Sequence, residues 1–337
     1  MYINCPKCHS QILKKKFCSF CGEILSINSS SEEIITHTRN PFQELRLRWL
    51  LLWFITSIPI AIIIFSILSG LYYILDLIES VQGSFNDPAL LLITESIYRY
   101  GFLTIWIYYI FKKHNISPKV LIGNFEQKYP WKIIFFIFVA TIFYSLGAHW
   151  TLSYPLAHII PDQISSLLNE KIFFTANDTT TPIIGNIVMF LNLVVLAPIF
   201  EELFFRGILF SRLSTKWNQT TAIIISSIIF GCLHPPNIIG ASVFGAILCI
   251  FYTRTNSLIV PITIHSINNL IIVVIVLLVG KTDTAINQLS NFENELFVAL
   301  LFIVISSPIV FGTLTRWWPK QNDDLPYKAN TKYLENK

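Results

Sequence analysis

Apolar runs of membrane-spanning length recur along the chain and are separated by short polar stretches. A helix needs about 20 apolar residues to cross about 30 Å of hydrocarbon, and eight runs approach or exceed that length. They cover residues 49–75, 89–111, 133–154, 183–205, 219–234, 238–253, 257–279 and 296–314. The fifth and sixth runs are short, as tilted or partly re-entrant helices would be. The pattern predicts an all-α polytopic membrane protein with about eight transmembrane helices.

The composition supports this fold class, and the basic residues predict its orientation. Of the 337 residues, 53% are hydrophobic and only 13% are charged, about half the charged share of a typical soluble domain. When the segments between the runs are taken alternately from the N-terminus, 21 of the 24 lysines and arginines fall in one set. The other set holds only Lys171 and Lys281, and Arg99 lies inside a run.

Cytoplasmic loops carry the excess of Lys and Arg in membrane proteins. We therefore expect an integral membrane protein with both termini in the cytoplasm, in the plasma membrane if the chain is prokaryotic. The net charge of +4 follows from the same bias and requires no nucleic-acid partner. The sequence therefore predicts that the helices are embedded in a lipid bilayer.

Two C-x-x-C motifs near the N-terminus predict a small zinc ribbon over residues 1–25. Their four thiols are spaced to hold one tetrahedral ion: Cys5, Cys8, Cys18 and Cys21. Two disulfides are the alternative, and a cytoplasmic location disfavours them. Four thiolates leave no open position for catalysis, so we expect a structural zinc or a module that docks another protein. Residues 26–48 read as a polar linker to the first run.

The stretch "LAPIFEELFFRGILF" places charged groups at the end of an apolar run. A carboxylate in a spanning helix costs about 2.5–3.5 kcal/mol, so Glu201 and Glu202 need an explanation. Glu202 and Arg206 are four residues apart and share one helix face, so they can pair. Glu201 points about 100° away and finds no partner on its own helix. This makes Glu201 a candidate general base. Glu202 and Arg206, taken alone, could be a simple salt bridge.

Two later apolar runs also carry polar side chains. "FGCLHPPN" places His234 at the end of the fifth run, and "PITIHSINNL" places His265 and Asn269 on one face of the seventh. A histidine before prolines is often a buried cap, and a His–Asn pair can join helices. Ionisable groups at membrane depth nevertheless mark functional sites, and here three helices each offer one. Another i,i+4 pair, Glu95 and Arg99, is expected to be structural.

These three motifs occur in the order in which the CPBP family has them. The chain resembles this family of intramembrane proteases, which includes the type II CAAX prenyl endopeptidases and bacterial bacteriocin-processing or immunity proteins. The resemblance extends over roughly residues 185–280, so we assign a catalytic core to 183–280. Residues 49–182 then form N-terminal transmembrane helices, and 281–337 form the last transmembrane helix and a cytoplasmic tail. The ribbon lies outside the resemblance.

The resemblance implies a function and a role for each polar residue. The protein would be an endopeptidase that cleaves a membrane-associated protein or peptide. Glu201 would polarise a water with help from His234, and His265 and Asn269 would stabilise the oxyanion of the intermediate. The paired glutamate and Arg206 would hold their helix in register. Peptide hydrolysis needs a water, a base and donors for the developing negative charge, and this set supplies them.

Three questions stay open at the level of sequence. One Glu and two His could hold a catalytic metal, but the H-E-x-x-H motif of soluble zinc proteases is absent. The same fold could serve as a non-catalytic scaffold or a bacteriocin-immunity factor, or as an ion transporter. In straight helices of full length, His234 would also lie far from Glu201 in depth. Only tilt, a shortened fifth helix or a water-filled cavity could bring the two together.

Overall fold

The computed structural model describes residues 2–4, 11–13, 40–48, 50, 67, 70, 87–123, 129–169, 172–279, 289–320 and 322–336. Most of these residues lie in helices. The α-helices are α3 (Pro88–Lys113), α4 (Pro118–Ile122), α5 (Trp131–Ile159), α6 (Pro161–Asn169), α7 (Pro182–Leu191), α8 (Ala197–Glu202), α9 (Ser211–Lys216), α10 (Gln219–Cys232), α11 (Ile238–Thr255), α12 (Ile259–Val279), α13 (Leu289–Arg316) and α14 (Pro326–Glu335). A 3-10 helix, η1, covers Pro41–Glu44. Two π-helical segments, η2 (Asn192–Leu196) and η3 (Leu203–Phe210), join α7, α8 and α9 into one helix.

The N-terminal segment contributes two short strands. β1 (Tyr2–Asn4) pairs antiparallel with β2 (Gln11–Leu13), and Tyr2 lies opposite Leu13. The four cysteines of the predicted ribbon lie outside the described residues, as does nearly all of the first predicted span, 49–75. The ribbon and the first span therefore stay predictions.

Six helices are long and apolar enough to cross a membrane, so the chain is an integral membrane protein. They are Pro88–Lys113, Trp131–Ile159, Pro182–Lys216, Ile238–Thr255, Ile259–Leu278 and Leu296–Arg316. Each of the seven runs predicted within the described residues forms a helix. The fifth run, however, becomes α10, whose 14 residues are too few to span. At 1.5 Å per residue, α10 is about 21 Å long, which is less than the thickness of the hydrocarbon.

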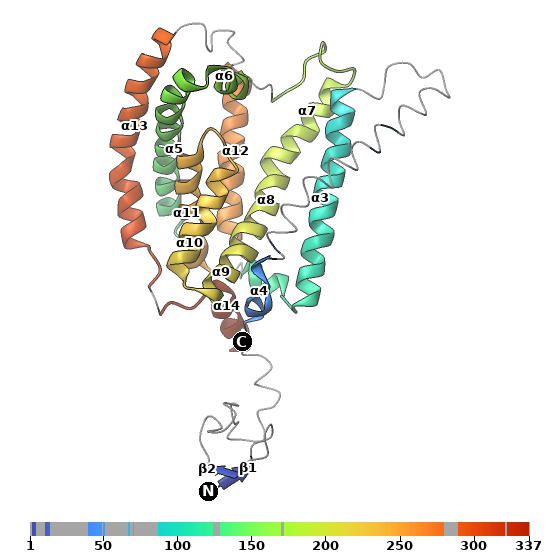
Figure 1. Cartoon of the computed structure of the whole chain (residues 1–337), viewed down its shortest axis with the longest axis vertical. Coiled ribbons are helices and arrows are strands. Elements are labelled where there is room, and N and C mark those ends of the chain that lie inside the picture. Colours follow the sequence, from blue (N-terminus) through green and yellow to red (C-terminus); the bar gives the residue numbers. More distant parts are fainter. Residues whose placement is uncertain are drawn as a thin grey trace.

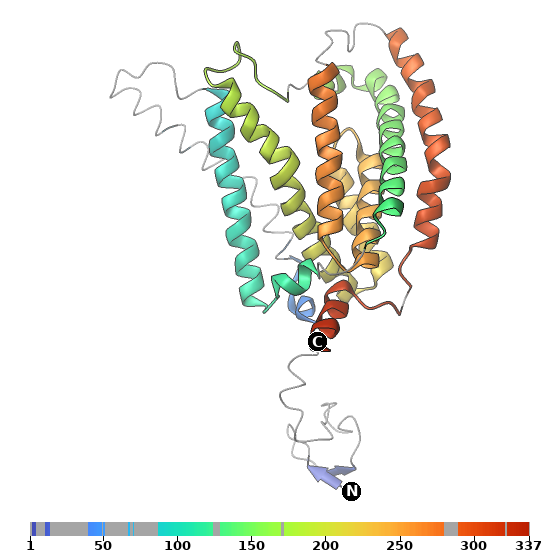
Figure 2. The same ribbon diagram turned by 180° about the vertical axis from the view of Figure 1, so that it is seen from behind.

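The helices are arranged around α11, which is the most enclosed of the six. About 61% of its span is buried, against 11% for α3 and at most 39% for the others. Figures 1 and 2 show α3 beside α7 at one side of the molecule, then α8 and α12, and then α5, α10, α11 and α13. The outer faces carry large apolar side chains such as Ile97, Ile105 and Leu278, which are 71%, 70% and 80% exposed. Lipid contact accounts for that exposure.

One end of the bundle is tied together by the C-terminal helix. Tyr327 on α14 packs its ring against Phe42, with centroids 5.3 Å apart, and its hydroxyl accepts from the Ser117 amide at 3.0 Å. Asn330 donates to the carbonyls of Val120 and Asn256 at 2.9 and 2.7 Å. Helix α14 thus joins the segments before α3, after α3 and after α11 at the same end of the molecule (Figure 1).

The opposite end is held by a buried carboxylate. Asp87 precedes α3, and one of its oxygens accepts from the Ala89 amide at 2.9 Å, which caps the helix. The same side chain accepts from the Thr179 hydroxyl and from the backbone and hydroxyl of Thr180, the latter two at 2.7 and 2.8 Å. This cluster fixes the start of α3 to the segment that leads into α7.

Candidate active site

The helix that carries both glutamates departs from α-helical geometry just before them. In η2 the amide of Ala197 donates to the Asn192 carbonyl, five residues back. The next residue, Pro198, has no N–H to continue this pattern, so the Leu193 carbonyl has no helical donor. The side-chain amide of Asn269 on α12 supplies one at 2.8 Å. A proline in the chain therefore creates the acceptor that fastens α12 to this helix.

The second π-helical segment, η3, begins directly after Glu202 and is buried over most of its length. Its arginine, Arg206, is only 1% exposed and donates from Nη1 to Oε1 of Glu202 at 2.6 Å. Nη2 donates to the Gly245 carbonyl at 3.2 Å, and the guanidinium carbon lies 4.6 Å from the centre of the Phe230 ring. Arg206 therefore lies within a helix that continues to Lys216, with its side chain in the protein interior.

Glu202 connects this arginine to the first of the two histidines. Its side chain is fully buried, and Oε1 lies 2.8 Å from Nδ1 of His265, which is 3% exposed. A carboxylate paired with Arg206 only accepts hydrogen bonds, so Nδ1 of His265 carries the proton. The pairing of Glu202 with Arg206 that the sequence predicts is present. Glu202 also links α8 to α12 through His265. The Nε2 atom of His265 is left facing Glu201.

The second histidine is held in the same way by the backbone. Nδ1 of His234 lies 2.6 Å from the Phe230 carbonyl, which accepts, so Nδ1 donates and Nε2 is free. The Phe230 ring packs against both imidazoles, with centroids 4.3 Å from His234 and 5.8 Å from His265. The helix that carries Glu201 continues to Lys216, and α10 turns back from Gln219, so Glu201 and His234 each lie 15 residues from this turn and reach the same depth. The continuation of the fourth helix beyond Glu201 thus brings the two together.

The carboxylate of Glu201 faces both free imidazole nitrogens. Its Oε2 atom lies 3.8 Å from Nε2 of His265 and 3.9 Å from Nε2 of His234. These distances exceed a direct hydrogen bond but suit groups that share a water. Oε2 is buried and has no hydrogen-bond partner, while the side chain as a whole is 31% exposed. The structure therefore brings a carboxylate and two imidazoles to one point.

Asn269 lies outside this cluster of direct contacts. Its one described donor bond goes to the Leu193 carbonyl, and its Oδ1 accepts from the side-chain amide of Asn268 at 3.2 Å. Of the six predicted residues, five are joined by contacts of 3.9 Å or less. The sixth, Asn269, is joined to the same helix through a backbone carbonyl.

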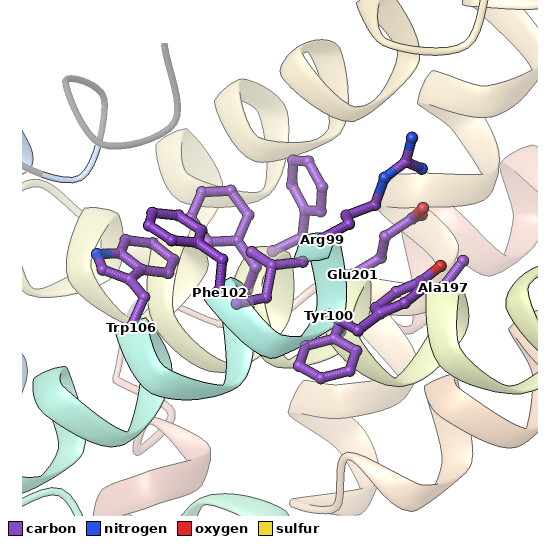
Figure 3. Close-up of a pocket in the computed structure, with 10 residues that line it drawn as sticks. Arg99, Tyr100, Phe102, Trp106, Ala197 and Glu201 are labelled. Carbon is purple, nitrogen blue, oxygen red and sulfur yellow. The ribbon is translucent and has the colours of Figure 1, made fainter. Parts of the chain in front are cut away.

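A cavity that the sequence did not predict opens beside Glu201. Its volume is about 140 Å³, and it lies between α3 and the segment from α8 to η3. The lining residues are Arg99, Tyr100, Phe102, Leu103, Trp106, Ala197, Phe200, Glu201, Phe204 and Phe205. Figure 3 shows the side chains of Arg99 and Glu201 extending in the same direction at one end of the cavity. Helical spacing of aromatic residues on α3 is ordinary in a membrane helix, so no sequence signal marked this wall.

Two imidazole nitrogens and a carboxylate are ligands of the kind that zinc accepts. Among the residues that the structure describes, no group of three or more His, Cys, Asp and Glu side chains is already arranged at metal-ligand spacing. We therefore derive no chemical step through a metal.

The class of protein follows from this helical membrane fold, its buried glutamate–histidine site and a family comparison. Residues 183–271 match the model of the family described as Type II CAAX prenyl endopeptidase Rce1-like, which supports an intramembrane protease at the level of the family. The chain is also 35% identical over 82 residues to a Bacillus subtilis protein named "Putative membrane peptidase YdiL". That similarity covers 24% of this chain and 34% of the relative. No solved structure matches the chain.

Proposed function

We propose that this chain is an intramembrane endopeptidase that hydrolyses a peptide bond in a membrane-associated protein or peptide. The observation that carries the proposal is the approach of two imidazole Nε2 atoms to one carboxylate oxygen, at 3.8 and 3.9 Å. Both imidazoles have their Nδ1 atoms engaged elsewhere, so both Nε2 atoms are available to a water. The match to the CAAX endopeptidase family supports the same activity.

Hydrolysis would begin with a water held between Glu201 and the two histidines. The carboxylate of Glu201 takes a proton from the water, and the resulting hydroxide adds to the carbonyl carbon of the scissile bond. The protonated glutamate then gives its proton to the amide nitrogen as the C–N bond breaks. The products are a new carboxyl terminus and a free amine, and Glu201 returns to its starting state.

The histidines would stabilise the oxyanion that forms between these two steps. Glu202 holds Nδ1 of His265 and so turns Nε2 toward Glu201, where an Nε2–H group would donate to the oxyanion. Asn269 has a second amide N–H beyond the one bonded to Leu193, and the family resemblance assigns it to the same task. His234 would hold the water for Glu201.

The decisive experiment compares the unaltered chain with Glu201→Gln in lipid vesicles that contain a library of synthetic membrane peptides, with products read by mass spectrometry. Gln is nearly isosteric with Glu but cannot take the proton, so we expect cleavage to fall at least a hundredfold. Equal cleavage by both proteins would remove the proposal. Absence of cleavage by the unaltered chain would favour the scaffold or immunity role.

We also propose that residues 1–25 form a zinc ribbon, on the strength of the two C-x-x-C motifs. Elemental analysis of the purified full-length chain is expected to find one zinc per chain, and Cys18→Ser with Cys21→Ser is expected to remove it. A second equivalent of zinc that disappears only in Glu201→Gln would instead indicate a metal at the catalytic site.

A further inference from the structure

The cavity beside Glu201 is lined mostly by apolar side chains, with Arg99, Tyr100 and Glu201 as its polar members. Its two walls come from different parts of the sequence. One wall belongs to α8 and η3, inside the matched region 183–271. The other wall belongs to α3, from Arg99 to Trp106, which lies outside that region. The chemistry and the shape of the cavity are therefore set by separate segments. Variation in α3 would change what fits without touching the reacting groups.

The size of the cavity limits its occupant. Its volume is about 140 Å³, and an apolar protein cavity of about 150 Å³ accommodates one benzene molecule. A single aromatic or branched aliphatic side chain has this bulk. A long prenyl chain has more than twice as many carbon atoms as benzene, so the cavity would enclose only part of it.

We propose that this cavity, defined by Phe102, Leu103, Trp106, Phe200 and Phe204, binds one bulky apolar side chain of the substrate next to the scissile bond. Glu201 lines the same cavity, so a side chain seated there would bring its own backbone to the carboxylate. An apolar side chain that fills an apolar cavity is removed from water, which favours its binding. The cavity thus selects the residue beside the cut. This inference rests on the proposed function.

The test alters the cavity from the α3 wall and measures which peptides are cleaved. The probe is a set of synthetic membrane peptides in phosphatidylcholine vesicles that differ only at the residues flanking the cleavage site found for the unaltered chain. We expect that chain to require Phe, Leu, Ile or Met at one fixed position. Leu103→Phe fills the cavity and should lower cleavage of the Phe peptide about tenfold relative to its Ala counterpart. Phe102→Ala enlarges the cavity and should improve cleavage of a Trp peptide.

Matched controls lie on the same helix but on its outer face. Ile105 and Ile97 are 70% and 71% exposed, so Ile105→Phe and Ile97→Ala should leave the preference unchanged. If all variants prefer the same substrate residue, or if the unaltered chain prefers none, the inference about the cavity is wrong. The proposed peptidase activity would still stand. Cleavage that strictly requires a prenylated cysteine, with no side-chain preference, would also overturn it.

A second readout works without turnover, so failure of the proposed function can be told apart from failure of the cavity assignment. Peptides that carry a diazirine analogue of leucine are irradiated with the Glu201→Gln protein, and the crosslinked residues are identified by mass spectrometry. We expect crosslinks at the cavity-lining positions 102, 103 and 106, competed by excess peptide and reduced in Leu103→Phe. Crosslinks confined to the lipid-facing positions 97 and 105 would overturn the inference even if no peptide is ever cleaved.

Discussion

Glu201 and Glu202 are adjacent in the chain and have opposite surroundings. The side chain of Glu201 is 31% exposed and has no direct hydrogen bond at Oε2, whereas that of Glu202 is fully buried. Glu202 accepts from both Arg206 and His265 through one oxygen. This contrast follows from helix geometry, since neighbours point about 100° apart. One carboxylate is free to react, and the other is committed to holding partners in place.

The two glutamates should therefore respond differently to the same substitution. Glu202→Gln leaves the buried Arg206 without its counter-charge, which typically costs about 3–5 kcal/mol, so we expect a clear fall in the thermal unfolding temperature. Glu201→Gln should lower that temperature much less, because Gln has nearly the same shape as Glu and Oε2 of Glu201 makes no hydrogen bond that the change would break. Scanning fluorimetry of both purified variants measures this. Equal destabilisation by the two changes would contradict the assignment of roles.

The sequence predicted part of this site and missed part of it for a physical reason. The pairing of Glu202 with Arg206 follows from their spacing on one helix. The contact of Glu202 with His265 joins residues 63 positions apart, and no local rule specifies such a contact. The α3 wall of the cavity was missed for the same reason, because its aromatic residues form a cavity only where α3 packs beside α8.

At the level of helices, Pro198 and Asn269 act as a pair. The proline removes the amide that the Leu193 carbonyl would use, and Asn269 replaces it from α12. Neither residue reveals this alone, because a proline in a membrane helix and an asparagine in another are both common. The π-helical segments were likewise not predicted, since apolar periodicity does not distinguish a π-helix from an α-helix.

A double-mutant cycle can measure this coupling. Asn269→Leu leaves the Leu193 carbonyl without a donor, at a cost of about 1–3 kcal/mol. Pro198→Ala restores a backbone N–H, so the same asparagine change should cost less in the Pro198→Ala background. The free energy of unfolding, measured by denaturant titration in detergent, gives the four values. If the cost is the same in both backgrounds, the proline is not the reason for the bond.

Asp87 predicts a pH dependence at the junction of α3 and α7. Hydrogen bonds from Thr179 and then from the Thr180 backbone hold the pKa of the Asp87 carboxyl well below its ordinary value. Its contribution to stability is therefore fully present above the unfolded pKa of about 4 and is lost as the pH falls further. The difference in unfolding temperature between the unaltered chain and Asp87→Asn should be constant from about pH 7 to pH 5 and shrink below about pH 4. A difference that shrinks already at pH 6 would contradict this.

At the scale of the whole molecule, the distribution of charge agrees with the arrangement of the helices. Helix α14, the end of α3 and the turn after α11 meet at one end of the bundle (Figure 2), and the sequence predicts that these segments are cytoplasmic. Arg206 is among the 21 basic residues of the predicted cytoplasmic set, and its side chain is buried in the protein. Removing it leaves 20 basic residues against two, so the predicted orientation does not depend on it.

This orientation can be tested by labelling single added cysteines in intact cells. Asn177 is exposed in the segment that Thr180 ties to Asp87, and Glu335 is exposed on α14 at the other end of the bundle. Because basic segments stay in the cytoplasm, a maleimide that cannot cross membranes should label Asn177→Cys from outside. It should label Glu335→Cys only after the cells are opened, and the unsubstituted chain gives the background from native cysteines. If Glu335→Cys is labelled first, the basic end faces outward, and a substrate would reach the site from the opposite side to the one the charges predict.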